Sequence, residues 1–165
     1  APAQKHFMTE CTSNVLQECS RDQLVNAYDN SIVETDHFLN SVIQWLEAKE
    51  GHADTAMVYV ADHGESLGEN GIYLHGMPYS IAPDVQKHVP WVTWLSPSMQ
   101  TRTGISTGCL QQNMRDKRIS HDSYFHSVLG LLDVQTGLHQ LALDVYADCA
   151  AATSASASKK MPLPG

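Results

Sequence analysis

A long helical repeat followed by a short apolar strand restricts what this chain can fold into. Apolar residues recur every three or four positions from Leu24 to Leu46, and the Ser20–Gln23 pair before them matches a capping box. Residues 55–60 are nearly all apolar, which is typical of a strand buried on both faces of a sheet. This order predicts an α/β fold in which a central sheet has helices on both faces.

Three later segments extend the expected domain. Residues 89–95 predict a second strand, because they are largely apolar and their proline stands at the start, where a strand tolerates it. Ser120 is positioned to cap a helix that continues through Leu132. A short helix is expected within residues 141–149. These elements follow the same α/β pattern.

Length and charge limit the classes of function. One core burying roughly 70% of the unfolded chain's surface suits 165 residues; we assign it to 1–150 and expect 151–165 to be a disordered tail. The net charge of −8 repels a phosphate backbone, so we expect no nucleic-acid partner. No apolar run approaches the ~20 residues of a membrane span. Because the chain opens at Ala1, we expect a processed product or a piece of something longer.

The four cysteines predict two disulfides. They form no CxxC pair of the zinc-ribbon type. Their spacing suggests a short Cys11–Cys19 link and a longer Cys109–Cys149 closure, stabilising by roughly 2.5 and 4 kcal/mol in a chain-entropy model. The alternative of reduced, buried thiols is disfavoured because Cys11 and Cys19 lie in a polar stretch. An oxidising compartment follows.

The strongest candidate site is Asp62-His63-Gly64-Glu65, where the predicted strand ends and a glycine-rich loop begins. Ligands bind at such edges of α/β sheets, and Asp and His side chains are zinc ligands. His75, in the same loop, is a candidate ligand, proton donor or phosphate contact. In the competing interpretation, Asp62 binds a loop amide and both histidines are ordinary surface residues. Two ligands leave a zinc site incomplete, so further donors must come from elsewhere.

A rival motif overlaps these residues. Residues 64–68 (GESLG) match G-x-S-x-G, the nucleophile elbow of α/β-hydrolases. Candidate triad partners follow in the required order: Asp84, Asp116 or Asp122, then His126 or His139. An elbow must continue into a helix, however, and residues 68–71 (GENG) are typical of a turn. We therefore interpret the match as accidental.

A longer pattern resembles one family. Residues 59–76 (YVADHGESLGENGIYLHG), with Pro78-Tyr79, 82–84 (APD) and 88–90 (HVP), are similar to the lipid A phosphoethanolamine transferases, including the mobilised colistin-resistance enzymes. The resemblance covers roughly residues 7–150. It implies that residues 1–150 are the C-terminal part of a periplasmic catalytic domain with the alkaline phosphatase and sulfatase fold, attached to a membrane domain absent from this chain.

The resemblance also implies a chemistry. Family members use a zinc-bound threonine to move phosphoethanolamine from phosphatidylethanolamine to a lipid A phosphate at the periplasmic face of the bacterial inner membrane, which confers polymyxin resistance. Asp62 and His63 match zinc ligands, and His75 matches a histidine beside the substrate phosphoethanolamine. No residue here matches the family's threonine, its glutamate ligand or a further histidine, so we expect this chain to be inactive alone. We also expect a monomer. The alternatives are a related metal-dependent sulfatase or phosphatase, and a non-catalytic periplasmic metal-binding domain.

Overall fold

The computed structural model describes residues 5–150, which fall into two compact units. The first unit ends at Leu95, and the second begins at Ser96. The elements of the first unit are η2 (Leu16–Glu18), α1 (Arg21–Glu47), β1 (Ala56–Val60), β2 (Ser66–Leu67), η3 (Glu69–Gly71), β3 (Tyr73–Leu74), α2 (Asp84–Lys87) and β4 (Trp91–Leu95). Those of the second are α3 (Pro97–Thr103), α4 (Thr107–Asp116), α5 (Asp122–Leu131), η4 (Leu141–Leu143) and η5 (Ala147–Cys149). The tail expected at 151–165 lies outside the described residues.

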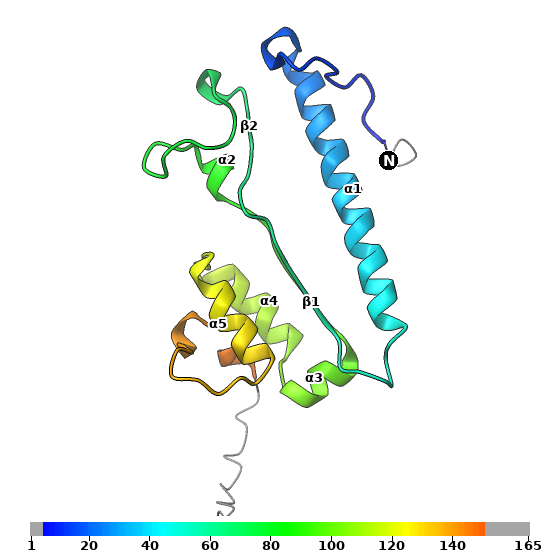
Figure 1. Ribbon diagram of the computed structural model, residues 1–165, viewed down its shortest axis with the longest axis vertical. Helices are drawn as coiled ribbons and strands as arrows, with labels where there is room; N and C mark the ends of the chain where they lie inside the picture. Colours follow the sequence, from blue (N-terminus) through cyan, green and yellow to red (C-terminus); the bar gives the residue numbers. More distant parts are fainter. Residues whose placement is uncertain (1–4, 151–165) are drawn as a thin grey trace, which may run out of the picture. The chain divides into compact units, whose positions relative to one another are not determined.

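Helix α1 begins where the sequence predicted. The Ser20 side chain accepts a hydrogen bond from the Gln23 N–H, and the Gln23 side chain accepts one from the Ser20 N–H, so both halves of the capping box form. One face of α1 holds the preceding segment through Asn30, which accepts from His6 and Phe7 N–H groups and donates to the Phe7 carbonyl. The helix contacts β1 and β2 and runs beside the β1–β4 ribbon in Figure 1.

Two small antiparallel sheets complete the first unit. Strands β1 and β4 pair along their whole length, from Ala56 opposite Leu95 to Val60 opposite Trp91. The expected strand at 55–60 is therefore present, but within β1 only Met57 is buried, because the sheet that these residues form has just two strands. Strands β2 and β3 form a short hairpin inside the loop that the sequence left unstructured.

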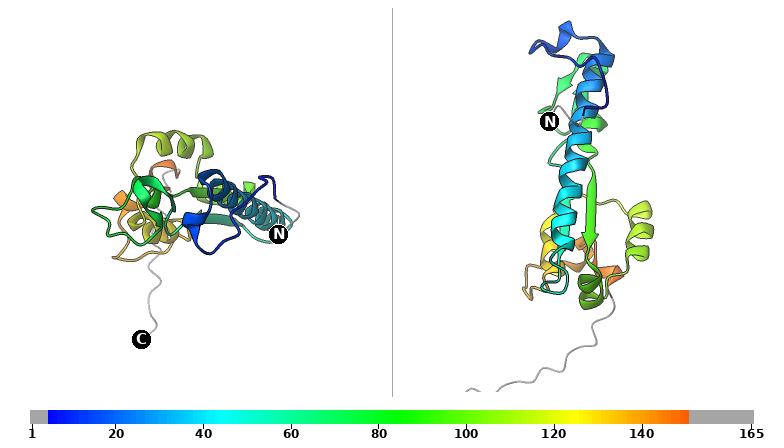
Figure 2. Two further views of the ribbon diagram at one scale, coloured as in Figure 1. Left: turned by 90° about the horizontal axis from the view of Figure 1, so that it is seen from above. Right: turned by 90° about the vertical axis from the view of Figure 1, so that its right-hand side faces the viewer.

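The second unit is helical. The helix expected from Ser120 forms as α5, but its N-cap is His121 and no side chain caps it; the Ser120 hydroxyl accepts a hydrogen bond from the Asp122 N–H at 3.3 Å. The short helix expected within 141–149 is instead two separate 3-10 turns, η4 and η5. The core of the second unit includes Met99, Ile105, Leu110, Leu131, Val145 and Tyr146. The right-hand view of Figure 2 shows α3, α4 and α5 from a second direction.

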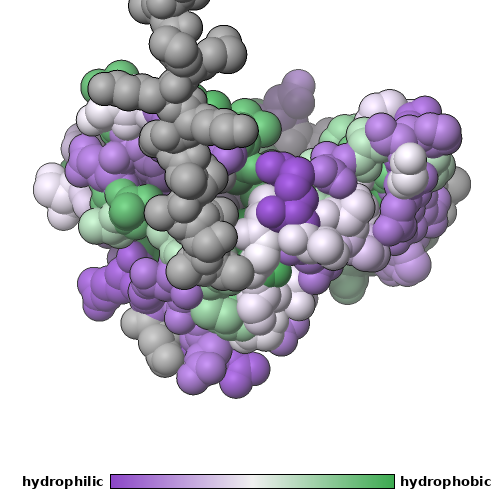
Figure 3. All heavy atoms as spheres, turned by 90° about the horizontal axis from the view of Figure 1, so that it is seen from below, coloured by the Kyte–Doolittle hydropathy of each residue, from purple (hydrophilic) through white to green (hydrophobic). Residues whose placement is uncertain are grey.

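Both disulfides have the pairing that the spacing predicted. Cys11 bonds to Cys19 in the first unit and Cys109 to Cys149 in the second, with Cα atoms 5.6 and 5.5 Å apart. Within residues 5–150, no helix has the length and apolar character needed to cross a bilayer. On the face shown in Figure 3, hydrophobic side chains are interspersed among hydrophilic ones.

Candidate metal centre

The candidate site lies where β1 ends and the β2–β3 hairpin begins. Residues 62–65 continue from β1 into β2, and His75 directly follows β3. In the hairpin, Ser66 pairs with Leu74, so the next positions outward, Glu65 and His75, face each other across the open end. Strand pairing therefore brings together two side chains that are ten positions apart in the sequence.

Three side chains converge here. The His75 Nδ1 lies 2.7 Å from the Glu65 Oε1, and the His63 Nδ1 lies 3.8 Å from the same oxygen. The two imidazole rings stack with their centroids 3.6 Å apart. Among the described residues, this is the one group of three His, Cys, Asp or Glu side chains whose donor atoms all lie within 4.8 Å of one another.

The carboxylate of Glu65 is incompletely partnered. Its Oε2 is buried and has no hydrogen-bond partner, the one such nitrogen or oxygen among the side chains that the structure describes. Leaving a buried carboxylate oxygen unpaired is costly, and such atoms are expected to find a partner, including an ion. Two imidazoles and a carboxylate suit a divalent transition metal. The donor set therefore fits a metal ion.

Asp62 lies beside this cluster and not inside it. Its side chain is 88% exposed; the Oδ1 accepts from the His63 N–H at 3.0 Å, and the Oδ2 lies 3.5 Å from the His63 Nε2. Hydrogen bonds from the backbone N–H groups of His63 and of Asp62 itself, with smaller contributions from the nearby imidazoles, lower the pKa of Asp62 below its ordinary value. The His63 Nε2 thus faces Asp62, whereas its Nδ1 lies 3.2 Å from the Gly64 carbonyl oxygen and 3.8 Å from the Glu65 Oε1.

Glu65 is the member that the sequence analysis did not assign. It belongs to the quoted Asp62-His63-Gly64-Glu65 motif, but its role depends on a contact with His75 that sequence spacing does not show. One signal was available, because residues two apart in an extended segment point to the same face. His63 and Glu65 have that spacing.

The structure argues against the nucleophile elbow. Ser66 is 1% exposed, and its hydroxyl accepts a hydrogen bond from the Gln86 side chain at 2.8 Å. Ser66 begins β2, and only the single 3-10 turn η3 follows that strand, whereas an elbow continues into an α-helix. A buried, hydrogen-bonded hydroxyl is unavailable to a substrate.

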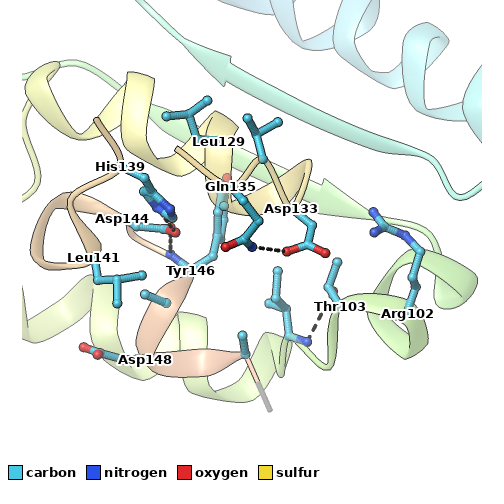
Figure 4. A pocket seen from close by; sticks show the side chains of 15 residues that line it. Arg102, Thr103, Leu129, Asp133, Gln135, His139, Leu141, Asp144, Tyr146 and Asp148 are labelled. Carbon is cyan, nitrogen blue, oxygen red and sulfur yellow. Dashed lines mark hydrogen bonds and ion pairs between the residues drawn. The ribbon is translucent and has the colours of Figure 1, made fainter. Parts of the chain in front are cut away.

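The second unit contains a different histidine–carboxylate arrangement, beside a cavity of about 410 Å³ (Figure 4). There the His139 Nε2 lies 3.0 Å from the Asp144 Oδ2, and the Asp144 Oδ1 accepts from the Tyr146 N–H at 2.8 Å. Gly130 permits this approach, since a Cβ on it would lie 1.9 Å from the Asp144 Oδ2. Both carboxylate oxygens are therefore partnered.

Known proteins with similar sequences identify the class of this chain. The sulfatase family model matches residues 1–134, and the chain belongs to that family. It is 45% identical over 148 residues to phosphoethanolamine transferase EptA of Salmonella typhimurium, covering 90% of this chain and 27% of that protein. It is 42% identical over 128 residues to phosphatidylethanolamine transferase Mcr-1 of Escherichia coli, covering 78% and 22%.

Solved structures agree. The soluble domain of lipooligosaccharide phosphoethanolamine transferase A from Neisseria meningitidis matches with a TM-score of 0.87 and 41% identity, covering 92% of this chain and 45% of that chain. The C-terminal periplasmic domain of EptC from Campylobacter jejuni matches with a TM-score of 0.78 and 35% identity, covering 88% and 45%. These matches confirm the expected α/β fold of the sulfatase type and the resemblance seen in the sequence. The chain spans about a quarter of the length of the EptA relatives.

Proposed function

We propose that this chain contributes its histidine–carboxylate cluster to a zinc-dependent phosphoethanolamine transferase. The donor would be phosphatidylethanolamine, the acceptor a lipid A phosphate, and the outcome resistance to polymyxins. The observation that carries the proposal is the Glu65 Oε2, buried without a partner beside two imidazoles in a segment similar to EptA and Mcr-1. A structural cluster would be expected to satisfy that oxygen internally.

The contacts of the two ring nitrogens of His63 suggest separate roles for Asp62 and His75. Asp62 and His63 would hold zinc, since the Asp62 Oδ2 and the His63 Nε2 lie 3.5 Å apart on the more exposed side. When bound, the metal would activate a nucleophile and stabilise charge on the phosphoryl oxygens. Further donors must come from beyond these two residues, as zinc takes about four, and the unpartnered Glu65 Oε2 would be one of them.

His75 would handle the substrate and not the permanent metal shell. Its Nδ1–H donating to the Glu65 Oε1 would orient the ring and select the tautomer, leaving the Nε2 as the atom that meets substrate. The side chain is half exposed and therefore accessible. A histidine held in this way can donate or accept the proton that phosphoryl transfer requires.

The compartment and assembly follow from the same reasoning. Two disulfides favour an oxidising environment, and two related structures are described as a periplasmic domain and an integral membrane protein. We place the site at the periplasmic face of the inner membrane, where a membrane domain would bring it to the lipid, and we expect a monomer.

A segment exchange tests the activity. The 148-residue part of Salmonella EptA that aligns with this chain is replaced by this chain's residues, and phosphoethanolamine on lipid A is measured by mass spectrometry. The exchange should retain transfer and polymyxin survival. Asp62→Ala and His63→Ala should lose both transfer and zinc, whereas His75→Ala should lose transfer but keep zinc.

The matched control is His52→Ala, which removes an exposed histidine from the turn after α1. This variant should behave like the unmodified exchange. Full transfer in the His63→Ala variant, or unchanged zinc in both metal-ligand variants, contradicts the proposed site. Loss of zinc from His75→Ala would move that residue into the metal shell.

A related metal-dependent sulfatase or phosphatase is the second candidate, because the family model that matches is the sulfatase model. Substrate choice separates the two. The exchanged protein should act on a phosphatidylethanolamine analogue and leave an aryl sulfate and an aryl phosphate intact. Faster turnover of either aryl ester would favour the second candidate.

A further inference from the structure

Helix α2 is joined to the metal-centre loop by close backbone contact at Gly64. The buried Gly64 donates its N–H to the Gln86 carbonyl at 3.0 Å. A Cβ at Gly64 would lie 1.9 Å from the Val85 carbonyl oxygen, so no larger residue fits without moving the backbone. The loop and α2 therefore pack against each other without an intervening side chain.

A second link lies two residues further along. Gln86 is 6% exposed and Ser66 is 1% exposed; the Gln86 Nε2 donates to the Ser66 Oγ at 2.8 Å. A buried hydrogen bond of this kind holds its geometry, because neither group can exchange its partner for water. One residue of α2 thus binds the loop at position 64 through its backbone and at position 66 through its side chain.

Glu65 lies between these two attachments. Positions 64 and 66 contact Gln86, whereas the Glu65 carboxylate contacts His75. Alternating residues of an extended segment point to opposite faces, so anchoring positions 64 and 66 on α2 orients position 65 toward the imidazoles. His63, two residues before Glu65, is carried by the same segment.

We propose that Gln86 is a positioning residue, and that its hydrogen bond to Ser66 holds Glu65 and His63 in place for His75 and a metal. This inference rests on the proposed function only where a metal is concerned. It also gives Ser66, the serine of the G-x-S-x-G pattern, a role. Its hydroxyl accepts the bond that sets the loop and does not act on substrate.

The first test needs no metal. In the metal-free 165-residue chain labelled at histidine, NMR should show a cross-peak between the ring protons of His63 and His75, whose centroids are 3.6 Å apart. Gln86→Met keeps the side-chain length but removes the donor, and this variant should lose the cross-peak. Asn30→Ala is the control, since Asn30 is equally buried but contacts residues of the 5–10 segment.

The second test measures zinc affinity by calorimetry. Gln86→Met should weaken zinc binding roughly 10–100-fold, the usual effect of removing a partner that orients a metal ligand. Ser66→Ala combined with Gln86→Met removes both polar groups and should recover much of the thermal stability lost in Gln86→Met. Zinc binding should nevertheless stay weak in the double variant.

These outcomes separate the two proposals. A His63–His75 cross-peak that persists in Gln86→Met overturns the positioning role, whatever zinc does. Recovery of zinc affinity together with stability in the double variant also overturns it, because the effect would then be one of folding. If zinc binding is the same in His63→Ala as in the unmodified chain, the proposed metal site fails, while the cross-peak still decides the role of Gln86.

Discussion

The two histidine–carboxylate groups of this molecule differ in how completely their polar atoms are partnered. In the second unit, both oxygens of Asp144 have donors, and His139 and Asp144 are largely buried. At the metal-centre loop, the Glu65 Oε2 has no partner, and the neighbouring His63 and His75 rings are partly exposed. The first arrangement is complete within the chain, and the second is not.

This difference distinguishes a structural group from a candidate functional one. A buried carboxylate with both oxygens satisfied stabilises a particular packing, and removing one partner leaves the other unpaired. An unsatisfied carboxylate beside accessible imidazoles costs stability and is expected where a ligand supplies the missing contact. The cavity beside His139 is therefore a weaker candidate for a functional site than the cluster of His63, Glu65 and His75.

The largest expected effect comes from the disulfide that closes the second unit. Cys109–Cys149 spans 40 residues, which include α5 and the His139–Asp144 pair, whereas Cys11–Cys19 spans eight. Replacing Cys109 and Cys149 by serine should lower the free energy of unfolding by about 4 kcal/mol, against about 2.5 for the shorter pair. Urea denaturation of the two double variants measures both values. Equal losses, or a larger loss from the shorter pair, would contradict this ranking.

Isosteric substitutions in the two groups provide the most direct comparison. Asp144→Asn places an amide NH₂ against one of two donors, His139 or the Tyr146 N–H, and should cost about 1–3 kcal/mol. Glu65→Gln removes a charge whose Oε2 is unpaired, and should leave stability unchanged or slightly higher.

Chemical denaturation of both variants without metal provides the measurement. Zinc binding should show the reverse order, weakened in Glu65→Gln and unaffected in Asp144→Asn. If Glu65→Gln is the more destabilising of the two, the distinction between the groups is wrong.

The smallest expected effect concerns Asp62. Its pKa is lowered from the ordinary value of 3.8, mainly by the hydrogen bond from the His63 N–H. A depressed carboxyl pKa adds stability that is present above 3.8 and is lost as the pH falls through the lower, folded-state value. Carbon-detected NMR titration of the metal-free chain should give a midpoint below 3.8 for Asp62. A midpoint at or above that value would show that the bond does not persist in solution.

Local patterns predicted the elements that depend on neighbouring residues. The capping box at Ser20 and Gln23 correctly located the start of α1, since its hydrogen bonds join residues three apart. Helices α3 and α4 were not predicted, although Ser96 followed by Pro97 is a helix start as well as a strand end. The Ser96-Pro97 pair is compatible with a strand end and with a helix start, and in the folded chain it is both, because β4 ends at Leu95 and α3 begins at Pro97.

The sequence by itself determined α1, the strands at β1 and β4, the helix α5, the disulfide pairing and the three candidate residues Asp62, His63 and His75. Helix caps, apolar periodicity and the eight-residue Cys11–Cys19 closure act over few residues, and pairing those two cysteines left Cys109 and Cys149 for each other. The tertiary structure decided that Glu65 meets His75 and that Gln86 holds the loop between them. Those contacts join residues ten and twenty positions apart, and they depend on the β2–β3 register and on the backbone approach at Gly64.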